Sequence, residues 1–296
     1  MYRPILIGTK HMTNNSSPNN RQIARFRARV WGHYYQHGRH HLPWRHTSDP
    51  YRIAVSEVML QQTQVSRVVP KYQEFLRQFP STKRLAEADL ASVLRSWQGL
   101  GYNRRAKSLW QCAGMVREKY SGRWPRSTVD LEKLPGIGPY TAAAIAAFAY
   151  RQPTVLIETN LRTVYLHHFF PKRGNVSEKE LISLIAKTVD SQQPREWYWA
   201  LMDYGAYIKQ AHGNRNRQAK SYSTQSRFVG SDREIRGAIV RLLANSQSVP
   251  VNELSRKFDF APGRIDTALA RLQAEGLIEV TDDNELRLPN TLLGIN

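Results

Sequence analysis

Apolar side chains recur along most of this chain at the three- and four-residue spacing of amphipathic helices. Between positions 22 and 37 the recurring residues place one apolar stripe on a helix: Ile23, Phe26, Val30, Trp31 and Tyr34. Similar patterns predict helices over 52–60, 69–78, 82–87, 90–96, 141–150, 178–189 and 194–211, and one that ends near 120. The alternation of a half-buried strand is not sustained before about residue 245, so the larger part of the chain is predicted to be all-α.

The pattern changes after residue 231. Three short helical stretches are followed by two apolar runs on either side of Asp282-Asp283-Asn284, which predicts three helices and a short hairpin, a winged-helix-like α+β unit. Such a unit serves either as a DNA-binding or as a protein-contact module. The predicted organisation is a flexible arm over 1–21, a helical domain over 22–211, a basic linker or DNA-facing loop over 212–231, and the small domain over 232–290.

Charge narrows the choice of partner. The 296 residues carry a formal net charge of +19, with a pI of about 10.2. A basic surface can serve solubility alone, but a surplus of this size in a chain with 41% hydrophobic residues favours nucleic acid. The single cysteine, Cys112, excludes a disulfide framework and any site held by several thiolates. Neither a membrane-length apolar stretch nor a secretory leader is recognisable, so we expect a monomeric protein in the cytoplasm or associated with the nucleoid.

A glycine hairpin is the most distinctive local feature. Leu134-Pro135-Gly136-Ile137-Gly138-Pro139-Tyr140 separates a polar segment from an alanine-rich helix. The two glycines permit a tight turn that directs backbone N–H groups to one side, at the positive end of the following helix. A phosphate suits this position, although an ordinary connection between two helices would have the same sequence.

Three further segments carry candidate chemistry. Glu57 lies among apolar residues, so burial would raise its pKa and let it hold a proton, unless it is a surface glutamate. The run Gln61-Gln62-Thr63-Gln64 offers uncharged hydrogen-bonding groups suited to base edges. A second glycine turn ending in Tyr102 leads into Arg104 and Arg105, a combination that favours nucleic acid over a merely solvated helix face.

These segments together resemble a known family. Leu42-Pro43-Trp44-Arg45, the stretch SEVMLQQTQV at 56–65, the turn at 99–102 and the hairpin at 134–140 are similar, in this order, to adenine DNA glycosylases of the helix-hairpin-helix superfamily. The resemblance covers about residues 22–211. It implies two helical subdomains with DNA in the groove between them.

The resemblance also implies roles for individual residues. Glu57 matches the general acid that protonates the leaving purine, and Glu158 matches the carboxylate that stabilises the oxocarbenium-like sugar or bonds to it transiently. Asn160 matches a polar residue beside that carboxylate. Tyr140 stands where relatives that cleave the strand carry lysine, so Schiff-base formation and AP lyase activity are not expected.

DNA contacts follow in the same way. Gln62 and Tyr102 match residues that wedge into the duplex during base flipping, and the hairpin carbonyls of Leu134 and Gly136 match an alkali-cation site. The contacts expected with DNA are those of Arg45, Gln61, Gln62, Thr63, Tyr102, Arg104, Arg105, Gly136, Ile137, Gly138 and Arg162.

Three departures from the family pattern stand out. Glu158 replaces the usual aspartate. Judged from the sequence alone, Glu158 could instead only interact with the dipole of the following helix, which Thr159 or Asn160 can cap. Residues 212–231 contain none of the cysteines that hold a four-iron cluster in relatives, so no cofactor is expected. The winged-helix-like unit replaces the domain that reads 8-oxoguanine.

The resulting expectation is a monofunctional base-excision glycosylase that acts on double-stranded DNA with a mispaired or damaged base. Adenine is the expected target. The alternatives are thymine or uracil opposite guanine, a modified base, or a non-catalytic protein that senses lesions.

Overall fold

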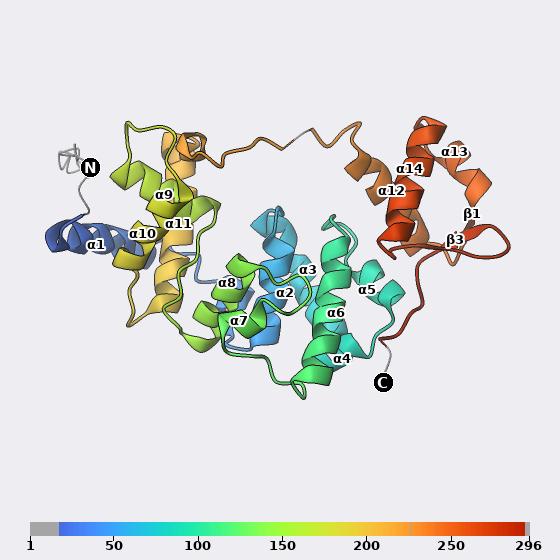
Figure 1. Cartoon of the computed structure of the whole chain (residues 1–296), viewed down its shortest axis with the longest axis horizontal. Helices are drawn as coiled ribbons and strands as arrows, with labels where there is room; N and C mark the ends of the chain where they lie inside the picture. Colours follow the sequence, from blue (N-terminus) through green and yellow to red (C-terminus); the bar gives the residue numbers. More distant parts are fainter. Residues whose placement is uncertain (1–17, 226, 294–296) are drawn as a thin grey trace. The chain divides into compact units, whose positions relative to one another are not determined.

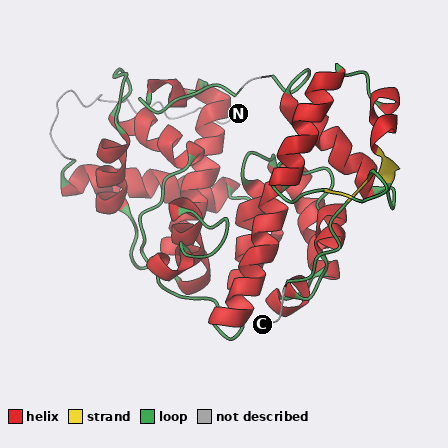
Figure 2. Cartoon of the chain, turned by 45° about the vertical axis from the view of Figure 1, so that its right-hand side comes forward, coloured by secondary structure: helices red, strands yellow, loops and turns green. Residues whose placement is uncertain are grey.

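The computed structural model describes residues 18–225 and 227–293, and helices dominate them (Figures 1 and 2). Residues 1–17 of the predicted arm lie outside the described residues. Two compact units form, one from the chain up to His40 together with Arg151–Ser223, the other from His41–Tyr150 together with the chain from Thr224 onward. Each unit therefore joins stretches that are distant in the sequence. Within the described residues, no helix is long and apolar enough to cross a membrane.

In the described part of the first unit there are four α-helices: α1 (Asn20–His37), α9 (Thr159–Phe169), α10 (Glu178–Thr188) and α11 (Pro194–His212). Helix α11 packs against both α1 and α9. Phe26 of α1 lies at the centre, with its ring 5.4 Å from that of Tyr165 and 6.0 Å from that of Trp197. All three rings are buried, so aromatic packing holds the N-terminal helix to segments more than a hundred residues away.

The segment after α11 is also built into the first unit. A short 3-10 helix (Arg215–Gln218) follows α11, and Val176 and Ala219 form an isolated parallel bridge. The buried amide of Asn216 donates to Thr163 Oγ1 at 2.9 Å. The first half of the predicted basic linker is thus packed structure, because its amide side chains supply the hydrogen bonds that keep it in place.

The first stretch of the second unit, residues 41–150, contains a short 3-10 helix (Pro43–His46) and seven α-helices, α2 (Pro50–Leu60), α3 (Val65–Gln78), α4 (Thr82–Ala86), α5 (Leu90–Ser96), α6 (Arg104–Lys119), α7 (Thr128–Leu131) and α8 (Pro139–Tyr150). Every residue of α8 from Thr141 to Phe148 is buried. Its alanines carry minimal side chains, so α2 can pack closely on it. This contact brings Glu57 of α2 to the start of α8.

The C-terminal part of the second unit holds α12 (Asp232–Ala244), α13 (Leu254–Lys257), α14 (Pro262–Ala274) and a small antiparallel sheet of β1 (Val249–Pro250), β2 (Glu279–Val280) and β3 (Glu285–Arg287). The strand order is β1-β3-β2, with Val249 opposite Leu286. Strand β1 extends the predicted hairpin by a third strand that was too short to be recognised. Figure 2 shows strands only here within the described chain, and the predicted fold class is confirmed.

Candidate active site and nucleic-acid interface

The carboxyl of Glu57 is buried and held by a tyrosine. Glu57 belongs to the last turn but one of α2 and is 5% exposed. Tyr140, the second residue of α8, donates its hydroxyl proton to Glu57 Oε2 at 3.0 Å. The alternative interpretation, a surface glutamate, is therefore wrong. Two residues that are 83 positions apart in the sequence meet here because α2 and α8 pack together.

The glycine hairpin adopts a turn that only glycine tolerates well. Gly136 has a φ of +76°, and a Cβ at this position would lie 2.6 Å from Ser108 Cβ on α6. The N–H of Ile137 donates to the carbonyl of Leu134 at 3.1 Å, and the Ile137 side chain is buried. Gly138 is exposed, with open space around its Cα. Gly136 is exposed as well, so both glycines of the hairpin are open to a ligand, whereas the side chain of Ile137 is not.

Glu158 caps α9 with its own carboxylate. Its backbone is extended, and Oε1 accepts the N–H of Leu161 at 2.9 Å while Oε2 accepts the side-chain N–H of Asn160 at 3.2 Å. The prediction that Thr159 or Asn160 caps this helix is wrong, because the longer glutamate side chain reaches back to the third N–H. Burial raises the pKa of Glu158, and the hydrogen bonds from Asn160 and Leu161 oppose that rise.

A glycine of α11 sets the position of this turn. A Cβ on Gly205 would lie 2.3 Å from the carbonyl oxygen of Asn160 and 2.7 Å from its Cβ. Only a residue without a side chain lets α11 approach the Glu158–Asn160 turn so closely. Sequence reasoning missed this residue, because a single glycine inside a helix carries no signal of what packs against it.

The two predicted wedge residues, Gln62 and Tyr102, lie in the turns 61–64 and 99–102, called here the wedge turns, and share an unusual backbone conformation. Gln62 has a φ of +54° and Tyr102 a φ of +48°, both in the left-handed region, and both side chains are exposed. Non-glycine residues enter this region only where surrounding contacts hold them there. These contacts come largely from one arginine.

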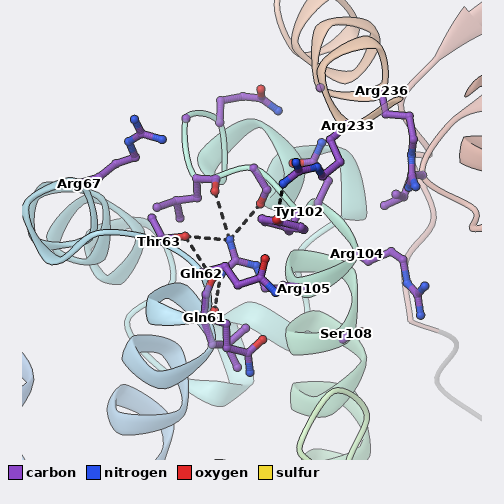
Figure 3. Close-up of a pocket in the computed structure, with 18 of the residues that line it drawn as sticks. Gln61, Gln62, Thr63, Arg67, Tyr102, Arg104, Arg105, Ser108, Arg233 and Arg236 are labelled. Carbon is purple, nitrogen blue, oxygen red and sulfur yellow. Dashed lines mark hydrogen bonds between the residues drawn. The ribbon is translucent and has the colours of Figure 1, made fainter. Parts of the chain in front are cut away.

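Arg105 ties the two turns together from within (Figure 3). Its guanidinium nitrogens lie 2.5–3.1 Å from six oxygen atoms, those of the carbonyls of Val58, Met59, Gln61, Leu100 and Gly101 and of the Thr63 hydroxyl. Burial lowers the pKa of Arg105 to about 10, so the group stays cationic at neutral pH. The predicted DNA contact of Arg105 is not what this geometry provides, because the guanidinium is turned inward to close the ends of both turns.

The neighbouring positions differ in access. Arg104 is exposed at the start of α6 and lines a cavity together with Gln61, Gln62 and Thr63. Arg45 is 8% exposed. Arg162 of the first unit is 3.6 Å from the Glu178 carboxylate. Arg104 is thus placed to meet a ligand directly, whereas Arg45 is largely enclosed and Arg162 already has a carboxylate beside it.

Two residues of the C-terminal segment also reach the wedge turns, and sequence reasoning missed both. Gln225 donates to Gln62 Oε1 at 3.0 Å and also to the hydroxyl of Tyr102. Arg233, in the first turn of α12, donates to the same hydroxyl at 2.9 Å (Figure 3). Their positive charge and amide groups were visible in the sequence, but their partners lie more than 120 residues away.

The residues that would hold the family's cofactors differ in their fit. Cys112, the one cysteine of the chain, is buried in α6, where burial raises the pKa of its thiol. Residues 212–231 supply no thiolate, so a four-iron cluster does not fit this chain. The carbonyl of Leu134 accepts one hydrogen bond and retains a second lone pair, which is compatible with a cation bound by the hairpin.

Comparison with known proteins gives a consistent result. Residues 55–189 match the family described as "HhH-GPD superfamily base excision DNA repair protein". The adenine DNA glycosylase of Mycolicibacterium smegmatis is 33% identical over 276 residues, covering 86% of this chain and 93% of that protein. This coverage exceeds the part of the chain that precedes α12, so the similarity extends into the C-terminal segment.

Other relatives are longer. The adenine DNA glycosylase of Buchnera aphidicola subsp. Baizongia pistaciae is 36% identical over 182 residues, and the chain spans 50% of its length. The human adenine DNA glycosylase is 35% identical over 200 residues, 36% of its length. Among solved structures, a thermostable thymine-DNA glycosylase superimposes with a TM-score of 0.58 at 25% identity, covering 66% of this chain and 91% of that one.

Proposed function

The chain belongs to the adenine DNA glycosylase family of the helix-hairpin-helix superfamily, and on this premise we propose that it excises adenine from mispaired DNA by hydrolysing the N-glycosidic bond. The observation that carries the proposal is the buried Glu57 carboxyl with its hydrogen bond from Tyr140. A buried carboxyl with a fixed orientation is the kind of group that general acid catalysis of base departure requires.

Glu57 acts as the general acid. In its protonated form it gives the proton to a ring nitrogen of the flipped purine, so that the base leaves as a neutral molecule when the C1′–N bond breaks. The hydroxyl of Tyr140 then donates to the carboxylate that remains, at the 3.0 Å distance already present. This hydrogen bond stabilises the ionised form of Glu57, and therefore favours the proton transfer.

Glu158 stabilises the sugar. Loss of the base leaves positive charge on C1′ and the ring oxygen, and an ionised carboxylate beside them lowers the energy of this state. The N–H of Leu161 and the amide of Asn160 each bind one oxygen of Glu158, which fixes the plane of the carboxylate. Water then adds to C1′ and loses a proton, completing the hydrolysis.

Strand cleavage is absent from this proposal. β-Elimination needs an amine that forms a Schiff base with C1′, and Tyr140 stands at the position where strand-cleaving relatives carry lysine. The proposed product is an intact strand with an abasic site. The fit of the hairpin carbonyls supports an alkali cation held by Leu134 and Gly136, which would add positive charge next to a DNA phosphate. The single buried cysteine supports a protein that works without an iron–sulfur cluster.

The test is a panel of duplexes carrying different mispairs and lesions, incubated with the protein and then treated with alkali to break the strand at abasic sites. We expect cleavage at adenine mispairs after alkali and none before it. Glu57→Gln should abolish excision while duplex binding persists. Glu118→Gln, a change of the same kind at an exposed residue of α6, should leave excision intact.

Two results would overturn the proposal. If no duplex is cleaved at high protein concentration, the chain is not a glycosylase for these bases. If Glu57→Gln retains activity, the general acid lies elsewhere. Nicking before alkali would contradict only the monofunctional assignment.

Thymine opposite guanine is the second candidate substrate. The observation that favours it is the similarity to a thymine-DNA glycosylase, which covers 91% of that chain. Excision of thymine rather than adenine in the same panel would select this alternative without changing the roles of Glu57 and Glu158.

A further inference from the structure

A large cavity lies within the second unit. Its volume is about 1330 Å³, above the roughly 300–1,000 Å³ of pockets that enclose a small molecule. One wall consists of the two wedge turns, with Gln62 and Tyr102, and the other consists of α12 of the C-terminal segment (Figure 3). A space of this size between two walls suits part of a polymer better than a single small ligand.

The lining is strongly basic. Among the described residues, the lining of the cavity includes no carboxylate. Six arginines border it: Arg67, Arg104, Arg105, Arg233, Arg236 and Arg241. Arg105 is bonded within the wedge turns, and Arg236 forms an ion pair with Glu275. A concave surface lined by charges of one sign concentrates the field and attracts polyanions. Glutamines and Tyr102 add the uncharged contacts that nucleotides use.

One face of α12 is shaped for a backbone that comes close. Arg233, Gly237 and Arg241 are spaced four residues apart and therefore share a helix face, and all three line the cavity. Around the Cα of Gly237, the space that a side chain would fill contains no other atom within 4 Å. This face therefore carries one arginine on each side of Gly237, where the helix has no side chain.

We propose that this face of α12 binds the phosphate backbone of the DNA that Gln62 and Tyr102 enter. The proposal deepens the proposed function and rests on it for the identity of the DNA. Arg233 already bonds to the Tyr102 hydroxyl at 2.9 Å, so a strand that contacts the wedge lies within reach of α12. The arginines of α14, which a winged helix would present to DNA, instead pair with Asp232: Arg264 at 3.1 Å and Arg271 at 3.0 Å.

The first test measures binding of a fluorescently labelled mispaired duplex by anisotropy between about 50 and 200 mM salt. Arg241→Ala should weaken binding roughly five-fold and make the plot of log affinity against log salt shallower by about one. Arg256→Ala, which removes the same charge from an exposed position of α13 outside the cavity, should change neither. Equal behaviour of the two variants would overturn the proposal.

The second test places charge at Gly237. Gly237→Glu and Gly237→Gln fill the same space and differ only in charge, so Gly237→Glu should bind DNA roughly ten-fold more weakly than Gly237→Gln. Equal affinities of these two would show that no phosphate lies there. If Arg241→Ala weakened the binding of a protein partner but left the affinity for DNA unchanged, the cavity would be a protein-binding site and the proposal would fail.

The binding assay requires no base excision, so the two proposals can fail separately. Absence of excision by the native chain, with the expected binding losses, would remove the proposed function but keep the DNA-binding face. Normal excision, with affinity unaffected by both sets of variants, would remove only the α12 face.

Discussion

Two opposing effects act on the charge of Glu158, namely its burial and the hydrogen bonds that its carboxylate accepts. As the N-cap of α9 it accepts the N–H of Leu161, and as the proposed stabiliser of the sugar cation it must be ionised. Burial raises its pKa, which disfavours the charged form. The donors from Asn160 and Leu161 oppose this effect, so the cap itself helps the carboxylate to stay ionised.

The pH dependence of excision should report this carboxylate. Because the pKa of Glu158 is raised above that of a free glutamate, the single-turnover rate should fall on acidification at a higher pH than an ordinary glutamate would give. Below that pH the carboxyl is protonated and cannot stabilise positive charge on the sugar. Glu158→Gln keeps an acceptor for the Leu161 N–H and should lower the rate by about 10²-fold or more, with the acidic limb removed.

The measurement is a set of single-turnover rates at saturating protein across the acidic range, for the native chain and Glu158→Gln. Thermal unfolding of both controls for loss of the cap, which the glutamine oxygen should preserve. An unchanged acidic limb in Glu158→Gln would assign the titration to another group.

At the scale of elements, local patterns predicted most helices, because apolar spacing is set within a few turns of chain. They failed where a distant partner decides the outcome. One error was local, because α3 begins at Val65 rather than at 69 and continues through Pro70. Arg105 was predicted to bind DNA from its neighbours in the sequence, but four of its six acceptors lie more than 40 positions earlier in the chain. The pairing of Glu57 with Tyr140 was equally invisible, although the family resemblance had selected both residues.

Gly205 gives a test of packing between elements. An alanine in a helix interior normally stabilises relative to glycine by about 0.5–1 kcal/mol. At Gly205 the new Cβ would meet the backbone of Asn160 at 2.3–2.6 Å, so α11 and the Glu158 turn must separate. Gly205→Ala should therefore destabilise the fold by about 1–3 kcal/mol and reduce excision, since the carboxylate moves with the turn.

Gly32→Ala supplies the matched control. Gly32 lies in α1 with no atom within 4 Å of the added Cβ, so the same substitution should raise the free energy of unfolding there. Chemical denaturation of both variants gives the comparison. Stabilisation by Gly205→Ala would mean that α11 and α9 can separate without cost.

At the scale of the whole molecule, the chain is organised by contacts that cross long distances in the sequence. The sequence predicted one helical domain over 22–211, whereas in the structure α1 packs with α11, and residues 41–150 belong to the other unit. The charge of +19 was sufficient to favour nucleic acid, but not to locate the basic cavity. Its wall on α12 comes from a segment that the sequence presented as separate.

The segment after α11 is held to the first unit by amide hydrogen bonds, and their contribution to stability can be measured. Asn216 Nδ2 donates to Thr163 Oγ1 at 2.9 Å in the buried interior of the first unit. Asn216→Ala leaves that site without its donor and should lower the free energy of unfolding by about 1–3 kcal/mol. Trypsin should then cleave faster at Arg215, Arg217 and Lys220, whereas Asn20→Ala, at an exposed position of α1, should alter neither property.

A double-mutant cycle identifies the bond itself. Thr163→Val removes the hydroxyl with little change of volume, and the effects of Asn216→Ala and Thr163→Val should sum to more than the effect of both together, by about 0.5–1.5 kcal/mol. Strict additivity would mean that the two residues act independently and that other contacts hold the segment, such as the Val176–Ala219 bridge and the hydrogen bonds of Gln218. A positive coupling would mean that the hydrogen bond between Asn216 and Thr163 itself fixes the segment after α11 against α9.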